Sequence, residues 1–234
     1  MRQTFHVMGT VASLDIPGCE DGDVFKAAFE RLHKIDEDYS PFKPTSLVSR
    51  FNENKLKKPG PEFQKIVTAC QQWQKATDGY FSAWYGKEFE PSGYVKGWAI
   101  DEAAKVIKKA GYKTYCLGIG GDVLAASAGE KIWKVGIQDP RNPKRLLQAV
   151  HMSSGAIATS GAYERGAHII NPKTGTTAKA WKSVSIIGPD IISADVLATA
   201  AFAMEGAPEF LDGWHEYNYL LVDPKNRQVT NLAA

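Results

Sequence analysis

The chain has 234 residues, of which 44% are hydrophobic and 23% are charged, and its formal net charge is +2. This length is sufficient for a hydrophobic core, and the composition is that of a soluble globular protein. The nearly balanced charge excludes the concentrated basic face that nucleic-acid binding requires. The three cysteines are widely spaced and form no CxxC pair, so they predict neither a disulfide framework nor a zinc site.

Free thiols favour a reducing compartment, and the N-terminus has no signal-like apolar segment. We therefore expect a cytoplasmic protein; a periplasmic one stays open if a signal segment was trimmed. No apolar run reaches the length of a transmembrane span.

The hydrophobic pattern predicts helices in the first half of the chain and mostly strands in the second. Helices and strands interleave irregularly, with several hairpin-like neighbours, which favours the α+β class. With no repeat, low-complexity segment or linker, one domain over residues 1–234 is the simplest expectation. In chain order, the expected elements are a strand at 3–16, helices at 21–39, 61–77 and 97–110, strands at 114–119, 131–138, 148–152 and 184–187, a helix at 193–204 with Ser193 as N-cap, and a hairpin of 217–222 and 228–231.

Asp195 and Thr199 lie four residues apart in the last predicted helix, so they share one face. Two adjacent hard oxygen donors suit Mg²⁺, which accepts few protein ligands and leaves room for phosphate oxygens. The pair therefore predicts a site for a phosphorylated ligand. The alternative is an Asp that stabilises the positive end of the helix and a Thr that bonds back to a carbonyl. Taken alone, the pair slightly favours this alternative.

Four further features carry possible chemistry. The Gly-rich residues 118–122 either approach a phosphate or form a plain hairpin, and the hairpin is the favoured interpretation. Thr159 and Ser160 offer hydroxyl and amide donors to a phosphate or a flavin edge, and an ST-turn fits equally well. His168 sits in an apolar run, where a core role is the commoner one; beside a phosphate site it would serve as general base. Lys96 stands near a helix start, where it can contact phosphate.

Ten short segments follow one another in a characteristic order. This series spans nearly the whole chain and resembles the ApbE-like family of FAD:protein FMN transferases. The segments are MGT (8–10), SPFKPTSLVSRFN (40–52), GYFS (79–82), KGWAID (96–101), GIGGD (118–122), WKVGIQDP (133–140), ATSGAYER (158–165), HIINPKTG (168–175), SVSII (183–187) and ADVLATA (194–200).

The resemblance implies both a fold and an activity. The expected fold is α+β, with mixed, largely antiparallel sheets flanked by helices in a single compact ApbE-like, T-fold-like unit. The expected enzyme binds FAD, uses Mg²⁺, transfers FMN to a threonine hydroxyl of a target protein and releases AMP. Typical targets are flavin-carrying redox subunits and reductases.

The resemblance also implies roles for individual residues. His168 resembles the catalytic base. The backbone oxygen of Ala99, with Asp195 and Thr199, looks like the metal set. Contacts to FAD fall on Met8, Phe42, Tyr80, Phe81, Ser82, Lys96, Glu102 and Ile169, with Thr159 and Ser160 as hydroxyl donors.

The chain departs from the family pattern around the expected flavin site. The segment at residues 83–95 is shorter than usual, and Ser82 and Asn171 each replace an Asp. Two alternative functions therefore stay open. One is a Mg²⁺-dependent FAD pyrophosphatase, in which water replaces the threonine. The other is a FAD-binding protein without catalysis.

Overall fold

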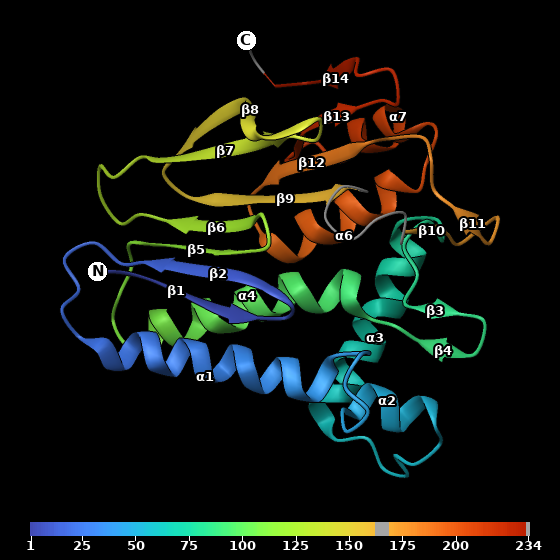
Figure 1. The fold of residues 1–234 in the computed structure, drawn as a ribbon, viewed down its shortest axis with the longest axis horizontal. Coiled ribbons are helices and arrows are strands. Elements are labelled where there is room, and N and C mark those ends of the chain that lie inside the picture. The colour runs from blue at the N-terminus through green and yellow to red at the C-terminus, as the bar shows by residue number, and fades with distance from the viewer. Residues whose placement is uncertain (162–168, 233–234) are drawn as a thin grey trace.

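A computed structural model describes residues 1–161 and 169–232. Within these residues, eight strands form one sheet in which every neighbouring pair is antiparallel. Figure 1 shows this sheet extending from β1 and β2 to β14, next to the C-terminus. In spatial order the strands are β1 (Arg2–Val7), β2 (Thr10–Asp15), β5 (Tyr115–Ile119), β6 (Asp122–Ala126), β9 (Gly155–Gly161), β12 (Ser183–Gly188), β13 (Asn218–Val222) and β14 (Gln228–Thr230).

Helices cover one face of the sheet, which we call the helix face. Helix α6 packs against β9 and β12, and α4 packs against both α6 and α1 (Figure 1). The alternation of strand side chains explains this layer, since Val184 and Ile186 of β12 enter the core beneath the helices while Ile187 points the other way. The helices are α1 (Gly22–Tyr39), α2 (Leu47–Asn52), α3 (Pro61–Ala76), α4 (Ser92–Lys109), α6 (Ile191–Phe202) and α7 (Ala207–Asp212).

A long hairpin covers the opposite face of the sheet. It consists of β7 (Trp133–Asp139) and β8 (Asn142–Met152), and Trp133 and Ile137 pack with Ile157 and Ile187 of the sheet in a second, smaller core. Two short hairpins stand apart from the sheet: β3 (Trp84–Tyr85) with β4 (Glu88–Phe89), and β10 (Ile170–Asn171) with β11 (Thr176–Thr177). None of the helices within the described residues has both the length and the apolar character that a membrane crossing needs.

The structure confirms the predicted α+β class and most of the predicted elements. Helices α1 and α3 match the ranges 21–39 and 61–77 within one residue at each end. The favoured hairpin at residues 118–122 is also confirmed, because Gly120 and Gly121 have φ values of 53° and 88° and join β5 to β6.

Several expectations were wrong in detail, and the strand expected at 148–152 already begins at Asn142. The expected strand at 3–16 is two strands, because Met8 and Gly9 take positive φ values and form a two-residue turn. Helix α4 begins at Ser92, five residues before the prediction, since tertiary packing overrides the low helix propensity of its two glycines. The N-cap of α6 is Asp190, whose carboxylate accepts the Ser193 amide. Thr159 and its neighbours lie within β9, which excludes the ST-turn, one of the two interpretations left open for them.

Candidate functional site

Lys96, Asp122 and Asp195 meet where α4, β6 and α6 adjoin, and we call them the Lys96 cluster. The Lys96 Nζ lies 2.7 Å from Asp122 Oδ2 and 3.9 Å from Asp195 Oδ1. Asp122 is fully buried and Asp195 is 3% exposed, whereas 23% of the Lys96 side chain is accessible. The cluster therefore combines two buried carboxyl groups with one lysine whose side chain is partly exposed.

The turn between β5 and β6 fixes Asp122. Asp122 is the first residue of β6, directly after the Gly120–Gly121 turn, and its Oδ1 accepts the backbone N–H of Thr159 at 3.0 Å. Sequence reasoning missed this residue as part of the site. The available signal was a carboxylate at the start of an apolar strand, a position where burial requires a charged partner.

Gly97 brings α4 and α6 into close contact at the same place. Its N–H donates to Asp195 Oδ2 at 2.8 Å, and a Cβ at this position would lie 2.9 Å from the backbone oxygen of Ile191. Only a glycine permits this approach of the two helices without a shift of backbone. The packing of α6 against Gly97 therefore orients the Asp195 carboxylate.

The electrostatics of the cluster favour an added cation. The pKa of Asp195 is raised to about 7, chiefly by burial and in part by the Asp122 charge, while Lys96 and the Gly97 N–H oppose the shift. Burial likewise raises the pKa of Asp122 against the opposing effect of Lys96. One ammonium faces two buried carboxyl groups, so with both ionised the cluster carries an excess negative charge.

Thr199 extends the cluster by one helical turn of α6. Its Oγ1 lies 3.4 Å from Ser160 Oγ, which projects from β9 on the helix face. A Cβ on Gly93 of α4 would lie 3.4 Å from the same Thr199 Oγ1 and 3.3 Å from the Phe81 ring. The Thr199 hydroxyl therefore lies close to the Gly93 backbone. The Ser160 hydroxyl and the Phe81 ring are its neighbours there.

The backbone beside Thr199 is that of Gly93, whereas the family resemblance implies Ala99 as the backbone ligand of the metal. Ala99 lies six residues further along α4, about 9 Å at the rise of an α-helix, and it is buried inside the helix layer. The Gly97 N–H, the usual helical donor to the Gly93 carbonyl, also donates to Asp195. Gly93 is therefore a further candidate for the backbone ligand, and the assignment of Ala99 stays a prediction.

A metal ion here would depend on mixed oxygen donors. Within residues 1–161 and 169–232, no three His, Cys, Asp or Glu side chains group as a metal-binding cluster. A carboxylate, a hydroxyl and a backbone carbonyl are nevertheless a hard-oxygen set of the kind Mg²⁺ accepts alongside phosphate oxygens. The donor chemistry and the excess negative charge both fit a divalent cation.

The segment expected to hold the flavin adjoins the β10–β11 hairpin. The Lys173 ammonium lies 4.1 Å from the centre of the Tyr80 ring and 2.6 Å from Asp78 Oδ2. Ile169, just before β10, is half-buried against the main core. Ser82 is buried, and its hydroxyl bonds to the backbone N–H and carbonyl of Trp84. Ser82 thus closes a local turn, and Tyr80 contacts the β10–β11 hairpin through Lys173.

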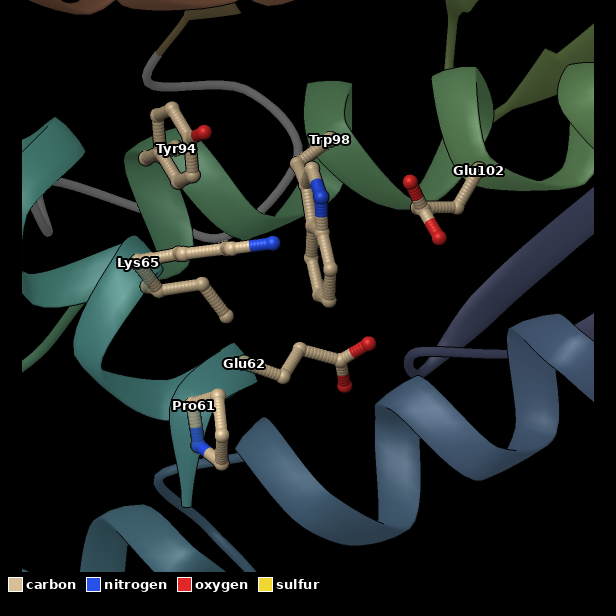
Figure 2. Close-up of a pocket in the computed structure, with 7 residues that line it drawn as sticks. Pro61, Glu62, Lys65, Tyr94, Trp98 and Glu102 are labelled. Carbon is tan, nitrogen blue, oxygen red and sulfur yellow. The ribbon is translucent and has the colours of Figure 1, made fainter. Parts of the chain in front are cut away.

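Several expected ligand contacts lie away from the Lys96 cluster. Glu102 is on a different face of α4, where it pairs with Arg31 at 2.6 Å and lines a pocket between α3 and α4 beside Trp98 (Figure 2). The Thr159 hydroxyl bonds Ser185 at 2.8 Å on the sheet face opposite the helices, so only the Thr159 amide reaches the cluster.

Two of the expected flavin contacts, Met8 and Phe42, lie in a turn and a loop. Met8 is half-buried in the β1–β2 turn, and Phe42, between α1 and α2, is 80% exposed. His168 lies outside the described residues. Its assignment as the base stays a prediction.

Comparison with known families identifies the class of protein that this fold and cluster define. The family model described as "ApbE family" matches residues 8–90 and 86–218. The chain belongs to the ApbE family, as the order of its segments predicted.

Individual relatives agree with this assignment. The FAD:protein FMN transferase of Buchnera aphidicola is 25% identical over 257 aligned residues, which cover 80% of this chain and 75% of the relative. That of Treponema pallidum is 33% identical over 139 residues, covering 51% of this chain but 38% of the relative. The crystal structure of the ApbE protein of Thermotoga maritima superposes with a TM-score of 0.86 at 20% identity, covering 98% of this chain and 96% of that one. The structural likeness establishes the fold.

Proposed function

We propose that this protein transfers FMN from FAD to a threonine hydroxyl of a target flavoprotein, with release of AMP. Its family membership supports flavin transfer, since the curated relatives carry the name FAD:protein FMN transferase. The observation that carries the proposal is the Lys96 cluster, in which two buried carboxyl groups lie beside the ammonium of a partly exposed lysine. A pyrophosphate with a bound divalent cation has the complementary charges.

Asp195, Thr199 and the Gly93 carbonyl would hold the Mg²⁺ ion. When bound, the ion would neutralise charge on the pyrophosphate and stabilise the departing AMP phosphate. The Lys96 ammonium would contact a phosphate oxygen, and the Gly97 N–H keeps Asp195 oriented for its ligand. These groups bind and orient the substrate without moving a proton.

His168 is the proposed general base, on the strength of its position in the HIINPKTG segment. It would accept the proton of the target threonine as the threonine oxygen attacks the FMN phosphorus. One phosphorus–oxygen bond forms to threonine, and the bond between the two phosphates breaks to give AMP. The product is a phosphoester-linked FMN on the target.

The test is mass spectrometry of a candidate flavoprotein after incubation with this protein, FAD and Mg²⁺. Transfer predicts an FMN adduct on a threonine, formed in equal amount to the released AMP. Free FMN and AMP without an adduct would identify a FAD pyrophosphatase. Bound FAD with no AMP would identify a FAD-binding protein without catalysis.

A further inference from the structure

We propose that Asp122 is a positioning residue that holds the Lys96 ammonium away from Asp195, leaving Asp195 available to a divalent cation. The inference deepens the proposed function and rests on it for the presence of that cation. Asp122 takes no part in the proposed reaction. Its full burial therefore calls for another explanation, because a buried carboxylate carries a large desolvation cost.

The distances show how the Lys96 ammonium is shared between the two acids. It lies 2.7 Å from Asp122 Oδ2, a direct ion pair, and 3.9 Å from Asp195 Oδ1, at the outer limit of one. An ammonium on a flexible four-carbon stem can reach either carboxylate by a small rotation. Among the described residues, Asp195 is the other carboxylate within 4 Å of the ammonium, and it would attract the ammonium in the absence of Asp122.

Asp122 is anchored so that it cannot follow the ammonium. Its backbone begins β6 in the antiparallel sheet, and its second oxygen, Oδ1, accepts the Thr159 N–H from the adjacent strand β9. Oδ1 is therefore held by β9, and Oδ2 lies 2.7 Å from the Lys96 ammonium. Asp122 acts as a fixed counter-ion to Lys96.

Asp195 keeps one oxygen available as a consequence. Its Oδ2 accepts the Gly97 N–H, while Oδ1 has Lys96 only at the longer distance. A direct Lys96–Asp195 pair would occupy Oδ1 and place a positive charge where a cation would bind. By drawing the ammonium toward β6, Asp122 prevents this competition.

Asp122→Asn is the decisive variant because it keeps the shape and the acceptor for Thr159 but removes the charge. In a crystal structure of this variant, Lys96 Nζ should lie within direct hydrogen-bond distance of Asp195. The dissociation constant of Mn²⁺, measured by electron paramagnetic resonance, should rise about tenfold, since a competing charge moves closer to the ligand. Asp139→Asn is a matched control, because Asp139 is also nearly buried but pairs with Arg141 in the β7–β8 hairpin.

The double variant Asp122→Asn/Lys96→Met separates positioning from structural support. With the competing ammonium removed, its Mn²⁺ affinity should return to within about threefold of Lys96→Met alone, by the logic of a double-mutant cycle. If the double variant stays as weak as Asp122→Asn, Asp122 supports the fold only and the proposal is overturned. An unchanged Lys96–Asp195 distance in the single variant would overturn it too. If the wild type binds no Mn²⁺, the proposed metal site is wrong. The position of Lys96 in the Asp122→Asn crystal structure then still shows whether Asp122 holds the ammonium away from Asp195.

Discussion

Substitution of Gly97 by Ala tests the contact between α4 and α6 on which the geometry of the site depends. The new Cβ would lie 2.9 Å from the Ile191 backbone oxygen, 3.0 Å from Asp195 Cβ and 3.2 Å from Asp195 Oδ2. A backbone oxygen cannot rotate away, so the helices must separate by some tenths of an ångström. Overpacking of this kind costs about 1–3 kcal/mol, and the better helix propensity of Ala returns up to about 1 kcal/mol.

We therefore expect Gly97→Ala to lower the free energy of unfolding by about 1–2 kcal/mol, or the melting temperature by roughly 2–8 °C. Differential scanning calorimetry measures this change. Gly22→Ala is the control, because Gly22 begins α1 and a Cβ there meets nothing within 4 Å; its stability should stay within about 0.5 kcal/mol of the wild type. Separation of the helices should also lengthen the bond from the Gly97 N–H to Asp195 and weaken Mn²⁺ binding. A Gly97→Ala protein as stable as Gly22→Ala would refute the reasoning.

Three further substitutions test individual roles. Asp195→Asn should reduce Mg²⁺-dependent AMP release by at least about a hundredfold, because it removes a ligand charge at the transition state; AMP release at the wild-type rate, followed by chromatography, would exclude Asp195 from the site. His168→Ala should keep FAD affinity, measured by fluorescence quenching, but lose FMN transfer, and normal transfer would disprove the base assignment. Phe42→Ala should leave the melting temperature unchanged, since its side chain is 80% exposed. If Phe42 forms a wall of the flavin site, the same change should raise the dissociation constant of FAD about three- to tenfold, and an unchanged constant would remove Phe42 from that site.

The sequence was most informative where the structure depends on local periodicity. Val24, Phe25, Ala28, Leu32 and Ile35 recur at helical spacing, and all five are buried in α1. Strand ends and turns were harder to predict, because the Met8–Gly9 turn depends on backbone angles that alternation of side chains does not reveal. The short helices α2 and α7, each of six residues, are too short for a periodic pattern to show.

The candidate site was predictable only in the parts that lie on one element. Asp195 and Thr199 could be paired because they are one helical turn apart on α6. Gly93 and Asp122 could not be recognised from the sequence as neighbours of Asp195 and Thr199. They reach this pair only because α4, β6 and α6, which are far apart in the chain, pack together. The bond between Gly97 and Asp195, for example, joins residues 98 positions apart. Glu102, only six residues after Lys96, lies instead in the pocket beside Trp98.

We expect Asp195, Thr199 and Lys96 to form the metal and phosphate end of a FAD site. Anomalous diffraction from crystals soaked with FAD and Mn²⁺ tests this directly. A Mn²⁺ peak should lie within bonding distance of Asp195 and Thr199, with a FAD phosphate beside Lys96. A Mn²⁺ peak or a FAD phosphate located elsewhere, such as in the pocket lined by Glu62 and Glu102, would contradict it.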